Sequence, residues 1–365
     1  MSTSIRYGVV GLGHIAQVAM LPAFAHAKRN SQLTALVSGD RTKRRELARR
    51  YRVDRVFSYE EFEECLRAVD AVYIALPNSL HAEYAIRAAR AGVHVLCEKP
   101  MAVTVDECRR MIAACRSGGV KLTVAYRLHF EALNLAAIDL ARSGRLGDLK
   151  YFASSFSMRV RRGDIRTKRA CGGGSLYDIG IYCINAARNL FRAEPTEVSA
   201  VSINSGVKTL SDIDETTAAT LRFGDDHVAS FVTSFNADDV GAYRIVGTKG
   251  QLHADPAYEY AEGLEYTVTS DGKTVRKRTR KHDQFAAELL YFSDCILHDR
   301  QPEPSGEEGL QDVRIVQALY ESAKIGKPVR IRPFAKTRRP TGRQRITRPG
   351  VSKPPLVKVQ SASRD

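Results

Sequence analysis

Short apolar runs alternate with amphipathic stretches along the first third of the chain. The apolar runs cover residues 5–10, 33–37, 71–76, 93–97 and 120–126, and helical periodicity occupies 41–51, 81–91 and 105–117. This alternation is typical of an α/β domain with a doubly wound parallel sheet. We therefore predict such a domain over residues 1–126.

The pattern changes after a hinge at Tyr126–Arg127. Shorter apolar runs, separated by turns such as Gly224-Asp225-Asp226, predict hairpins over residues 217–235, 243–254 and 264–276. Helical stretches lie at 133–142, after three glycines at 172–174, and at 282–298. Residues 127–334 are thus predicted to form a second, α+β domain with a mainly antiparallel sheet.

Composition narrows the class of protein without changing this picture. The 365 residues are 44% hydrophobic and 27% charged, as in soluble globular proteins. No apolar run approaches the roughly 18 residues of a membrane span, and the N-terminus lacks an export-signal pattern, so a cytoplasmic protein is expected. The seven cysteines show no metal-ligand spacing, which favours reduced thiols and predicts no metal site.

The net charge of +15 is distributed unevenly. Residues 335–365 carry nine Lys and Arg and a single Asp, and a second basic run covers 276–281. Such runs could attract nucleic acid, but solvated tails and hairpin rims are the commoner reading, so nucleic acid is not an expected partner. The tail is rich in Pro, Gly and Ser without apolar periodicity, which predicts disorder or an arm on a partner subunit.

The first apolar run leads into a dinucleotide-binding fingerprint, Gly11-x-Gly13-x-x-Ala16. Gly11 permits the tight turn, and Gly13 lets the backbone approach a pyrophosphate. A helix beginning near His14 and Ile15 would direct free N–H groups at the phosphates. These residues predict a nicotinamide dinucleotide cofactor.

The end of the second run indicates which dinucleotide is bound. Ser38 stands where NAD enzymes usually carry a carboxylate for the ribose 2′-hydroxyl, and Gly39, Arg41 and Lys43 follow it. A hydroxyl and cations suit a 2′-phosphate, which favours NADP. A register shift of two would instead make Asp40 an NAD-type acidic reader, so NAD is the alternative.

Two later strand ends contribute candidate site residues. The fourth run ends at Glu98-Lys99-Pro100, where ligands of an open α/β sheet bind. The third run ends at Leu76-Pro77-Asn78, with His81 opening the next helix. We expect these residues beside the cofactor, although His81 also suits a helix-entry position and Lys99 an exposed strand end.

Asp178, Tyr182 and Asn185 fall on one polar stripe of an otherwise apolar helix. Ser175 and Asp178 also fit a capping box, in which Asp178 would bind the first helical N–H. A cap accounts for Asp178 alone and leaves the other two polar residues unexplained. The stripe therefore predicts a substrate site.

Taken together, these motifs resemble the glucose–fructose oxidoreductase/inositol dehydrogenase (Gfo/Idh/MocA) family. The matching segments are Gly11-Leu12-Gly13, Leu76-Pro77-Asn78 with His81, Glu98-Lys99-Pro100, 172–182, 306–314 and 326–329. The sequence is most similar to the glucose–fructose oxidoreductase and NADP-dependent aldose dehydrogenase branch, through residues 38–43, 126–130 and 178–188. Unlike periplasmic glucose–fructose oxidoreductase, the sequence shows no twin-arginine leader or long N-terminal arm, so neither periplasmic export nor the non-dissociating cofactor associated with such an arm is expected.

The resemblance implies an NADP-dependent oxidoreductase that oxidises an aldose at C1 to a lactone. A tyrosine is a poor base at its ordinary pKa of about 10, so Lys99 would lower the pKa of Tyr182, which acts as acid/base, while Asp178 holds a substrate hydroxyl. The implied cofactor contacts are Gly11, Gly13, His14, Ile15, Ser38, Gly39, Arg41, Lys43, Leu76, Pro77, Asn78, His81, Glu98, Lys99 and Arg127. The implied substrate contacts are Lys99, Asp178, Tyr182, Lys168 and one of Tyr258 and Tyr260. The resemblance also implies that the second domain is an α+β domain with an open, mainly antiparallel mixed sheet, through which a homodimer or homotetramer would form.

Several alternatives stay open at this point. Dimeric dihydrodiol dehydrogenases of the family also carry Tyr at the position of Tyr182, so a dihydrodiol or cis-diol substrate is the main rival. Lys99 could serve as the base itself. A variant of the leading reading retains its cofactor while it oxidises one sugar and reduces another. A regulator that binds NADP without catalysis is the remaining class.

Overall fold

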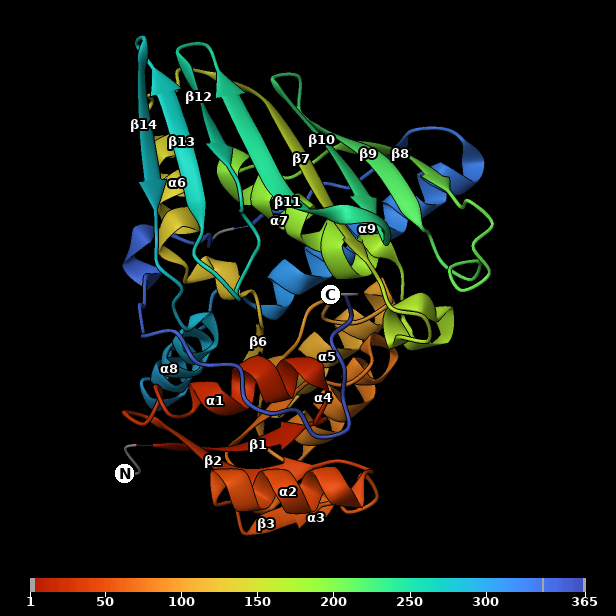
Figure 1. The fold of residues 1–365 in the computed structure, drawn as a ribbon, viewed down its shortest axis with the longest axis vertical. Helices are drawn as coiled ribbons and strands as arrows, with labels where there is room; N and C mark the ends of the chain where they lie inside the picture. Colours follow the sequence, from red (N-terminus) through yellow and green to blue (C-terminus); the bar gives the residue numbers. More distant parts are fainter. Residues whose placement is uncertain (1–3, 337, 364–365) are drawn as a thin grey trace. The chain divides into compact units, whose positions relative to one another are not determined.

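The computed structural model describes residues 4–336 and 338–363, which form two compact units (Figure 1). Unit 1 comprises residues 1–127, 282–310 and 346–361. Unit 2 comprises residues 128–281, 311–345 and 362–365. Each unit is thus assembled from segments that are far apart along the chain.

Unit 1 is built on a six-stranded parallel sheet with the strand order β3-β2-β1-β4-β5-β6. Its strands are β1 (Ile5–Val10), β2 (Ser31–Val37), β3 (Arg55–Phe57), β4 (Ala71–Ile74), β5 (His94–Cys97) and β6 (Leu122–Val124). The central strands β4 and β5 are buried along almost their whole length, as expected for a parallel sheet covered on both faces. The order reverses direction beside β1, which places the carboxyl ends of β1 and β4 at a topological switch point.

Helices connect the strands of unit 1 and supply its capping groups. They are the π-helix η1 (Ala16–Met20), α1 (Leu21–Ala23), α2 (Arg41–Tyr51), α3 (Phe62–Leu66), η2 (Asn78–Leu80), α4 (His81–Arg90), α5 (Val105–Ser117) and α8 (Gln284–Leu297). Thr104 and Glu107 form a reciprocal capping box at the start of α5. The last helix, α9 (Gly306–Ile325), starts in unit 1 and continues into unit 2.

Unit 2 contains a nine-stranded sheet with the order β14-β13-β12-β11-β7-β10-β9-β8-β15. Its strands are β7 (Leu149–Arg159), β8 (Glu197–Ile203), β9 (Thr216–Phe223), β10 (His227–Ser234), β11 (Asn236–Gly247), β12 (Gly250–Ala254), β13 (Glu265–Ser270), β14 (Lys273–Arg278) and β15 (Val329–Arg330). Only the β10–β7 pair is parallel. The predicted fold class, a parallel α/β domain followed by an α+β domain with a mainly antiparallel sheet, is confirmed.

Helices cover one face of the second sheet. The π-helix η6 (Leu176–Gly180) and α7 (Ile181–Phe191) pack against β7 and β10, and α6 (Ala132–Arg142) packs beside α7. Short 3₁₀ turns, η3 (Arg127–His129), η4 (Ile165–Thr167), η5 (Arg169–Cys171) and η7 (Gly342–Gln344), complete the unit. Figure 1 shows α7 and α9 lying behind the strands.

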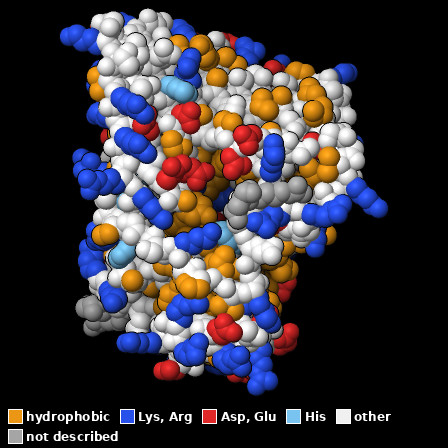
Figure 2. Space-filling view, in the orientation of Figure 1, with side chains coloured by type: hydrophobic (Ala, Val, Ile, Leu, Met, Phe, Trp, Pro, Cys, Tyr) orange, Lys and Arg blue, Asp and Glu red, His pale blue; other side chains and the backbone are white. Residues whose placement is uncertain are grey.

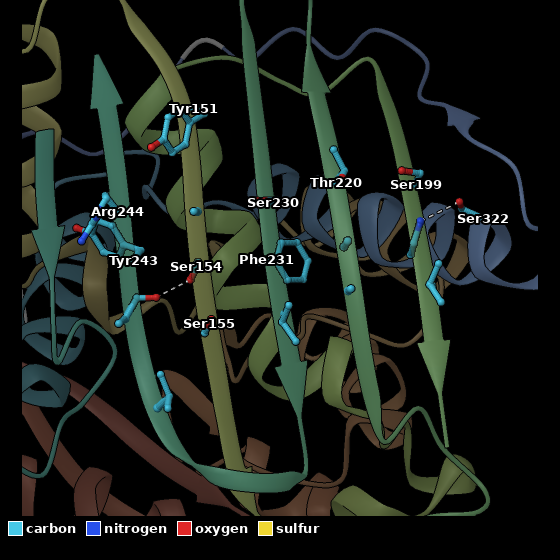
Figure 3. A pocket seen from close by; sticks show the side chains of 18 of the residues that line it. Tyr151, Ser154, Ser155, Ser199, Thr220, Ser230, Phe231, Tyr243, Arg244 and Ser322 are labelled. Carbon is cyan, nitrogen blue, oxygen red and sulfur yellow. Dashed lines mark hydrogen bonds between the residues drawn. The ribbon is translucent and has the colours of Figure 1, made fainter. Parts of the chain in front are cut away.

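The opposite face of this sheet is open. Strands β7 to β10 present apolar side chains there that are 42–66% exposed: Tyr151, Val201, Ile203, Val228 and Val232. The face is hollowed by a pocket of about 700 Å³ whose walls come from β7–β12 and the end of α9 (Figure 3). Figure 2 shows hydrophobic side chains gathered over this part of the sheet.

The described residues of the tail are divided between the two units. Residues 338–345 belong to unit 2, and residues 346–361 belong to unit 1, where Pro349 forms an isolated bridge with His282. Apart from the 3₁₀ turn η7, the described tail has no helix. Among the helices of the described residues, none is long and apolar enough to cross a membrane.

Candidate active site

The cofactor half of the site begins at the turn after β1. Gly11 has a φ of +94°, and a Cβ there would lie 2.4 Å from the carbonyl oxygen of Ala75, so only glycine fits. A Cβ on Gly13 would meet open space, and Gly13, His14 and Ile15 are partly exposed before the buried Ala16. This combination of a tight turn, an uncovered glycine and a helix start is a cradle that fits a pyrophosphate.

The end of β2 carries a hydroxyl and a group of cations. Ser38 is 4% exposed, and its Oγ accepts a hydrogen bond from the Asp40 N–H at 3.2 Å. The carboxylate of Asp40 caps α2 by accepting from the Lys43 N–H at 3.0 Å, and this bond lowers the pKa of Asp40. Arg44 donates to the Ser38 carbonyl. Asp40 is therefore engaged as a helix cap, and its neighbours Ser38, Lys43 and Arg44 are joined to the same turn by hydrogen bonds.

The segment after β4 is held by a buried histidine. The Nδ1 of His81 lies 2.8 Å from the Pro100 carbonyl oxygen and its Nε2 lies 3.0 Å from the Leu76 carbonyl oxygen. Burial lowers the pKa of His81, so the neutral ring donates to one of the two carbonyls. His81 thus links the ends of β4 and β5, a positioning role, whereas Pro77 and Asn78 are partly exposed at the strand end.

Glu98 and Lys99 stand at the end of β5, both half-buried. The Tyr73 hydroxyl donates a hydrogen bond to the Glu98 carboxylate, and the Lys99 N–H lies 3.2 Å from that carboxylate. Burial raises the pKa of Glu98, while the Lys99 ammonium and the Tyr73 hydroxyl oppose that rise. The peptide bond between Lys99 and Pro100 is cis.

A second carboxyl group lies beside Glu98 and was not predicted from the sequence. Glu288 of α8 is 2% exposed, and neither of its carboxyl oxygens has a hydrogen-bond partner within the described part of the chain. Burial and the Glu98 charge raise the pKa of Glu288 well above its ordinary value, whereas Arg127 opposes the rise. Arg127 is itself 5% exposed and donates to the Gln284 Oε1 at 2.5 Å. The feature of the sequence that could have indicated Glu288 is its position as an isolated carboxylate among the apolar residues 285–292.

The residues that the sequence assigned to the substrate lie in unit 2, at the start of the helix that follows the glycine run. Gly173 and Gly174 permit close approach, because Cβ atoms there would lie 2.3 Å from the Arg166 carbonyl oxygen and 2.3 Å from the Asp214 Oδ1. Asp214 accepts from the Ser175 hydroxyl at 2.6 Å and from the Leu176 N–H at 2.9 Å. These contacts hold the π-helix η6, a form that is frequent at functional sites.

The predicted polar stripe is divided by the structure. Between Gly174 and Asn185, the residues that are not buried are Asp178 and Tyr182. Asp178 does not cap the helix; its Oδ2 accepts from the Arg166 Nε at 2.7 Å. Asn185 is 7% exposed and bonds His129 and Asp312, each at 2.8 Å, so it belongs to the packing beneath the helix.

The aromatic residues around Tyr182 distinguish the two loop tyrosines. Tyr182 meets Phe156 edge-on, with ring centroids 5.6 Å apart, and Phe156 stacks on Tyr258 at 5.0 Å. Tyr258 is 1% exposed, and its hydroxyl lies 2.8 Å from the Ser154 Oγ. Tyr260 is half-buried in the same loop. The burial of Tyr258 favours Tyr260 as the substrate contact.

Lys168 is exposed in the loop before the glycines. Arg166, in the same loop, is the residue that contacts a candidate site residue. Arg166 pairs with Asp178 and, at 3.2 Å, with Asp164. The sequence placed Arg166 near the glycines but gave no sign of which carboxylate it would bind.

Comparisons with known proteins agree with both units. Residues 5–126 match the oxidoreductase family with an NAD-binding Rossmann fold, and residues 135–253 match the GFO/IDH/MocA C-terminal domain. The chain is 30% identical to the NADP-dependent D-xylose 1-dehydrogenase of Haloarcula marismortui, over 90% of this chain and 93% of that protein. It is 31% identical to a dTDP-3,4-didehydro-2,6-dideoxy-α-D-glucose 3-reductase of Streptomyces violaceoruber, over 89% of this chain and 97% of the reductase.

Among solved structures, an aldose–aldose oxidoreductase from Caulobacter crescentus in complex with glycerol is 37% identical, with a TM-score of 0.86, over 90% of this chain and 100% of that chain. A 3-ketoreductase from Actinomadura kijaniata, in complex with NADP, is 28% identical with a TM-score of 0.80, over 87% of this chain and 98% of that chain. The expected family and fold are confirmed by these matches: this chain belongs to the Gfo/Idh/MocA family of oxidoreductases.

Proposed function

We propose that this protein oxidises an aldose at C1 to the corresponding lactone, with NADP as cofactor. It is an oxidoreductase acting on CH–OH groups of sugars, in keeping with its xylose dehydrogenase and aldose–aldose oxidoreductase relatives. NADP is the cofactor, in line with the NADP-dependent relatives and with Ser38 in place of an acidic ribose reader. The oxidation of an aldose at C1 and the residues that act on it are the parts we propose.

The residues of unit 1 fit the cofactor in two places. The cradle of Gly11 and Gly13 would take the pyrophosphate, and Ser38 with Arg41 and Lys43 would take the adenosine 2′-phosphate. When bound, the nicotinamide supplies the hydride acceptor. Leu76, Pro77, Asn78 and the half-buried Glu98 and Lys99 belong to the neighbouring strand ends, where the nicotinamide ring of such a fold binds.

The proton of the C1 hydroxyl has to leave as the hydride does. In our proposal the Tyr182 oxygen, as the tyrosinate, takes this proton and becomes the neutral phenol, while the Lys99 ammonium orients the sugar hydroxyl. Asp178 accepts a hydrogen bond from another sugar hydroxyl, and Arg166 holds its carboxylate in a fixed orientation. In the reverse direction Tyr182 returns the proton.

The observation that carries this proposal is the exposure pattern of the helix after the glycines. Asp178 and Tyr182 are accessible one helical turn apart, while their neighbours from Gly174 to Asn185 are buried. A residue that only caps or only packs would not need this arrangement. A carboxylate and a phenol side by side suit a polyhydroxylated substrate, of which one hydroxyl is held and another deprotonated.

The test is an initial-rate panel with aldoses, ketoses and aromatic dihydrodiols, each with NADP and with NAD. We expect turnover of one or more aldoses with NADP, a lactone product, and little turnover of dihydrodiols. Turnover of dihydrodiols alone would favour the second substrate class, which a bovine trans-1,2-dihydrobenzene-1,2-diol dehydrogenase at 29% identity over 71% of this chain keeps in view. Binding of NADP without turnover of any substrate would favour a regulator.

The similarity to an aldose–aldose oxidoreductase favours one variant of this function. In it the cofactor stays bound while one sugar is oxidised and another reduced. Dialysis of the purified protein followed by an absorbance measurement of retained nicotinamide separates this variant from an ordinary dehydrogenase.

We further propose that the open face of the second sheet joins two copies of the chain, because its exposed apolar side chains suit a protein partner.

A further inference from the structure

The C-terminal segment 346–361 belongs to unit 1, and several of the residues that it touches there lie more than 300 positions earlier in the chain. The Asp283 N–H donates to the Arg348 carbonyl at 3.0 Å, and Arg50 donates to the Pro355 carbonyl at 2.6 Å. Figure 1 shows this segment, in dark blue, crossing in front of α1. It therefore passes over the helix that follows the phosphate-binding turn.

One buried side chain fixes this segment to that turn. The Gln17 Nε2 donates to the Leu12 carbonyl at 2.9 Å and to the Val357 carbonyl at 3.0 Å. The Val357 N–H donates to the Gln17 Oε1 at 2.8 Å. Gln17 is fully buried and Val357 is 5% exposed, so these bonds are shielded from water. Gln17 thus holds the tail by both of its amide atoms and the glycine turn by one.

The residue after this anchor reaches the end of β2. Lys358 has a φ of +48°, and its Nζ lies 3.3 Å from the Asp40 Oδ2. The Lys358 ammonium also lies close enough to Lys43 to lower that residue's pKa, after the larger effect of burial and against the Asp40 charge. Lys358 therefore offsets a carboxylate that would repel a phosphate, and it brings a further cation to Ser38, Arg41 and Lys43.

We propose that residues 346–361 form a strap on the adenosine half of the cofactor site and that Lys358 is a ligand of the NADP 2′-phosphate. This inference rests on the assignment of NADP as cofactor. A phosphate dianion between two ammonium groups makes charge-assisted hydrogen bonds, which are about twice as strong as neutral ones. The ribose 2′-hydroxyl of NAD offers no such charge, so the strap selects NADP and slows its release.

The alternative is that Lys358 and Asp40 form an exposed ion pair that has no role in cofactor binding, since the Lys358 side chain is 56% exposed. The phosphate-ligand hypothesis and this alternative predict different effects on the choice between NADP and NAD. A structural pair would alter NADP and NAD affinity equally or leave both unchanged. A phosphate ligand would alter the affinity for NADP alone.

The experiment is calorimetric titration of the cofactor-free full-length chain with NADP, NAD and 2′,5′-ADP. For Lys358→Ala we expect NADP and 2′,5′-ADP to bind about tenfold more weakly, which corresponds to about 1.4 kcal/mol, while NAD affinity stays constant. Lys358→Arg should retain most of the preference. Lys353→Ala, in the same exposed segment, is the matched control and should match the wild type.

Release of the cofactor tests the strap itself. NADP dissociation, followed by displacement with excess unlabelled 2′,5′-ADP, should be about tenfold faster in Val357→Pro, which removes the N–H that binds Gln17. The inference would be overturned if the ratio of NADP affinity to NAD affinity were the same in Lys358→Ala and the wild type. It would also be overturned if NADP dissociated from Val357→Pro at the wild-type rate. A wild type that fails to prefer NADP would instead overturn the cofactor assignment, so the two failures are distinguishable.

Discussion

At the scale of single residues, specific hydrogen bonds hold the side chains of the candidate site. Arg166 orients Asp178, Asp40 caps a helix, and His81 links two strand ends. The motifs singled out these positions in the sequence. Their partners were not predictable, since Arg166, Lys358 and Pro100 meet them only in the folded chain.

Asp178→Asn tests the role of the carboxylate. The amide keeps the shape but loses the charge that binds a sugar hydroxyl and Arg166, and a hydrogen bond to a charged group contributes about 1.5–3 kcal/mol. We expect kcat/KM for the aldose to fall about 10- to 100-fold with NADP affinity unchanged. Asp164→Asn, which alters the other carboxylate of Arg166, is the control and should retain nearly full activity.

Glu288 gives a prediction for the pH dependence of stability. Burial and Glu98 raise the pKa of Glu288 in the folded protein, so the protonated form is the one that folding favours. Stability from this group is present below the unfolded pKa of about 4.3 and is lost as pH rises toward the folded pKa. Glu288→Gln stays neutral, and we expect its melting temperature to gain on that of the wild type between pH 5 and pH 8 by a few degrees, on the order expected for about 1 kcal/mol.

Thermal unfolding followed by circular dichroism measures the difference in melting temperature between variant and wild type. Glu321→Gln replaces an exposed carboxylate on α9, and its difference from the wild type should not change with pH. A constant difference between Glu288→Gln and the wild type across this range would refute the assignment of a protonated, buried carboxyl group.

At the scale of elements, each half of the site begins with a glycine turn that leads into a π-helix. The sequence predicted both turns and both helices, because glycine runs and apolar periodicity are local signals. It did not predict the wider helical turns. In η6 the starting N–H of Leu176 is captured by Asp214, a residue 38 positions later, and no local pattern reports such a contact.

Asp214→Ala tests whether this contact holds the substrate helix. The carboxylate accepts from Ser175, Leu176 and the Tyr320 hydroxyl, the last at 2.6 Å, although its burial raises the pKa of Asp214 and offsets part of the gain. We expect a loss of about 2–4 kcal/mol in the free energy of unfolding, measured by urea denaturation. The exposed Asp212→Ala should lose less than about 1 kcal/mol; similar losses in both variants would show that Asp214 has no special part.

The tail is the element whose own sequence says least about its contacts. Its composition indicates a segment that cannot bury enough apolar surface to fold by itself, and that inference is sound for an isolated peptide. In the full chain, Gln17 and Asp283 offer it hydrogen-bond partners that were not visible in its own sequence. An extended tail with few apolar residues can therefore be ordered by a scaffold built hundreds of residues earlier.

At the scale of the whole molecule, the family resemblance predicted the two fold classes and the open sheet. The face of that sheet carries Val232 beside its register partner Ala218 on β9. If this face joins two copies, Val232→Asp places a charge in an apolar interface and should convert the oligomer to a monomer in light scattering coupled to size exclusion. Val56→Asp, an exposed apolar position on β3 of unit 1, should leave the mass unchanged, and an unaffected mass in Val232→Asp would exclude this face.

The account as a whole requires a phenol of unit 2 and an ammonium of unit 1 to act on one sugar hydroxyl. The most direct measurement is the single-turnover rate of nicotinamide reduction by the aldose in Tyr182→Phe, with NADP affinity measured on the same protein and Tyr151→Phe as the control. We predict a fall of at least about 100-fold, within the range for loss of a general acid–base, with NADP affinity and the control unchanged. A Tyr182→Phe rate within a few-fold of the wild type would contradict the account.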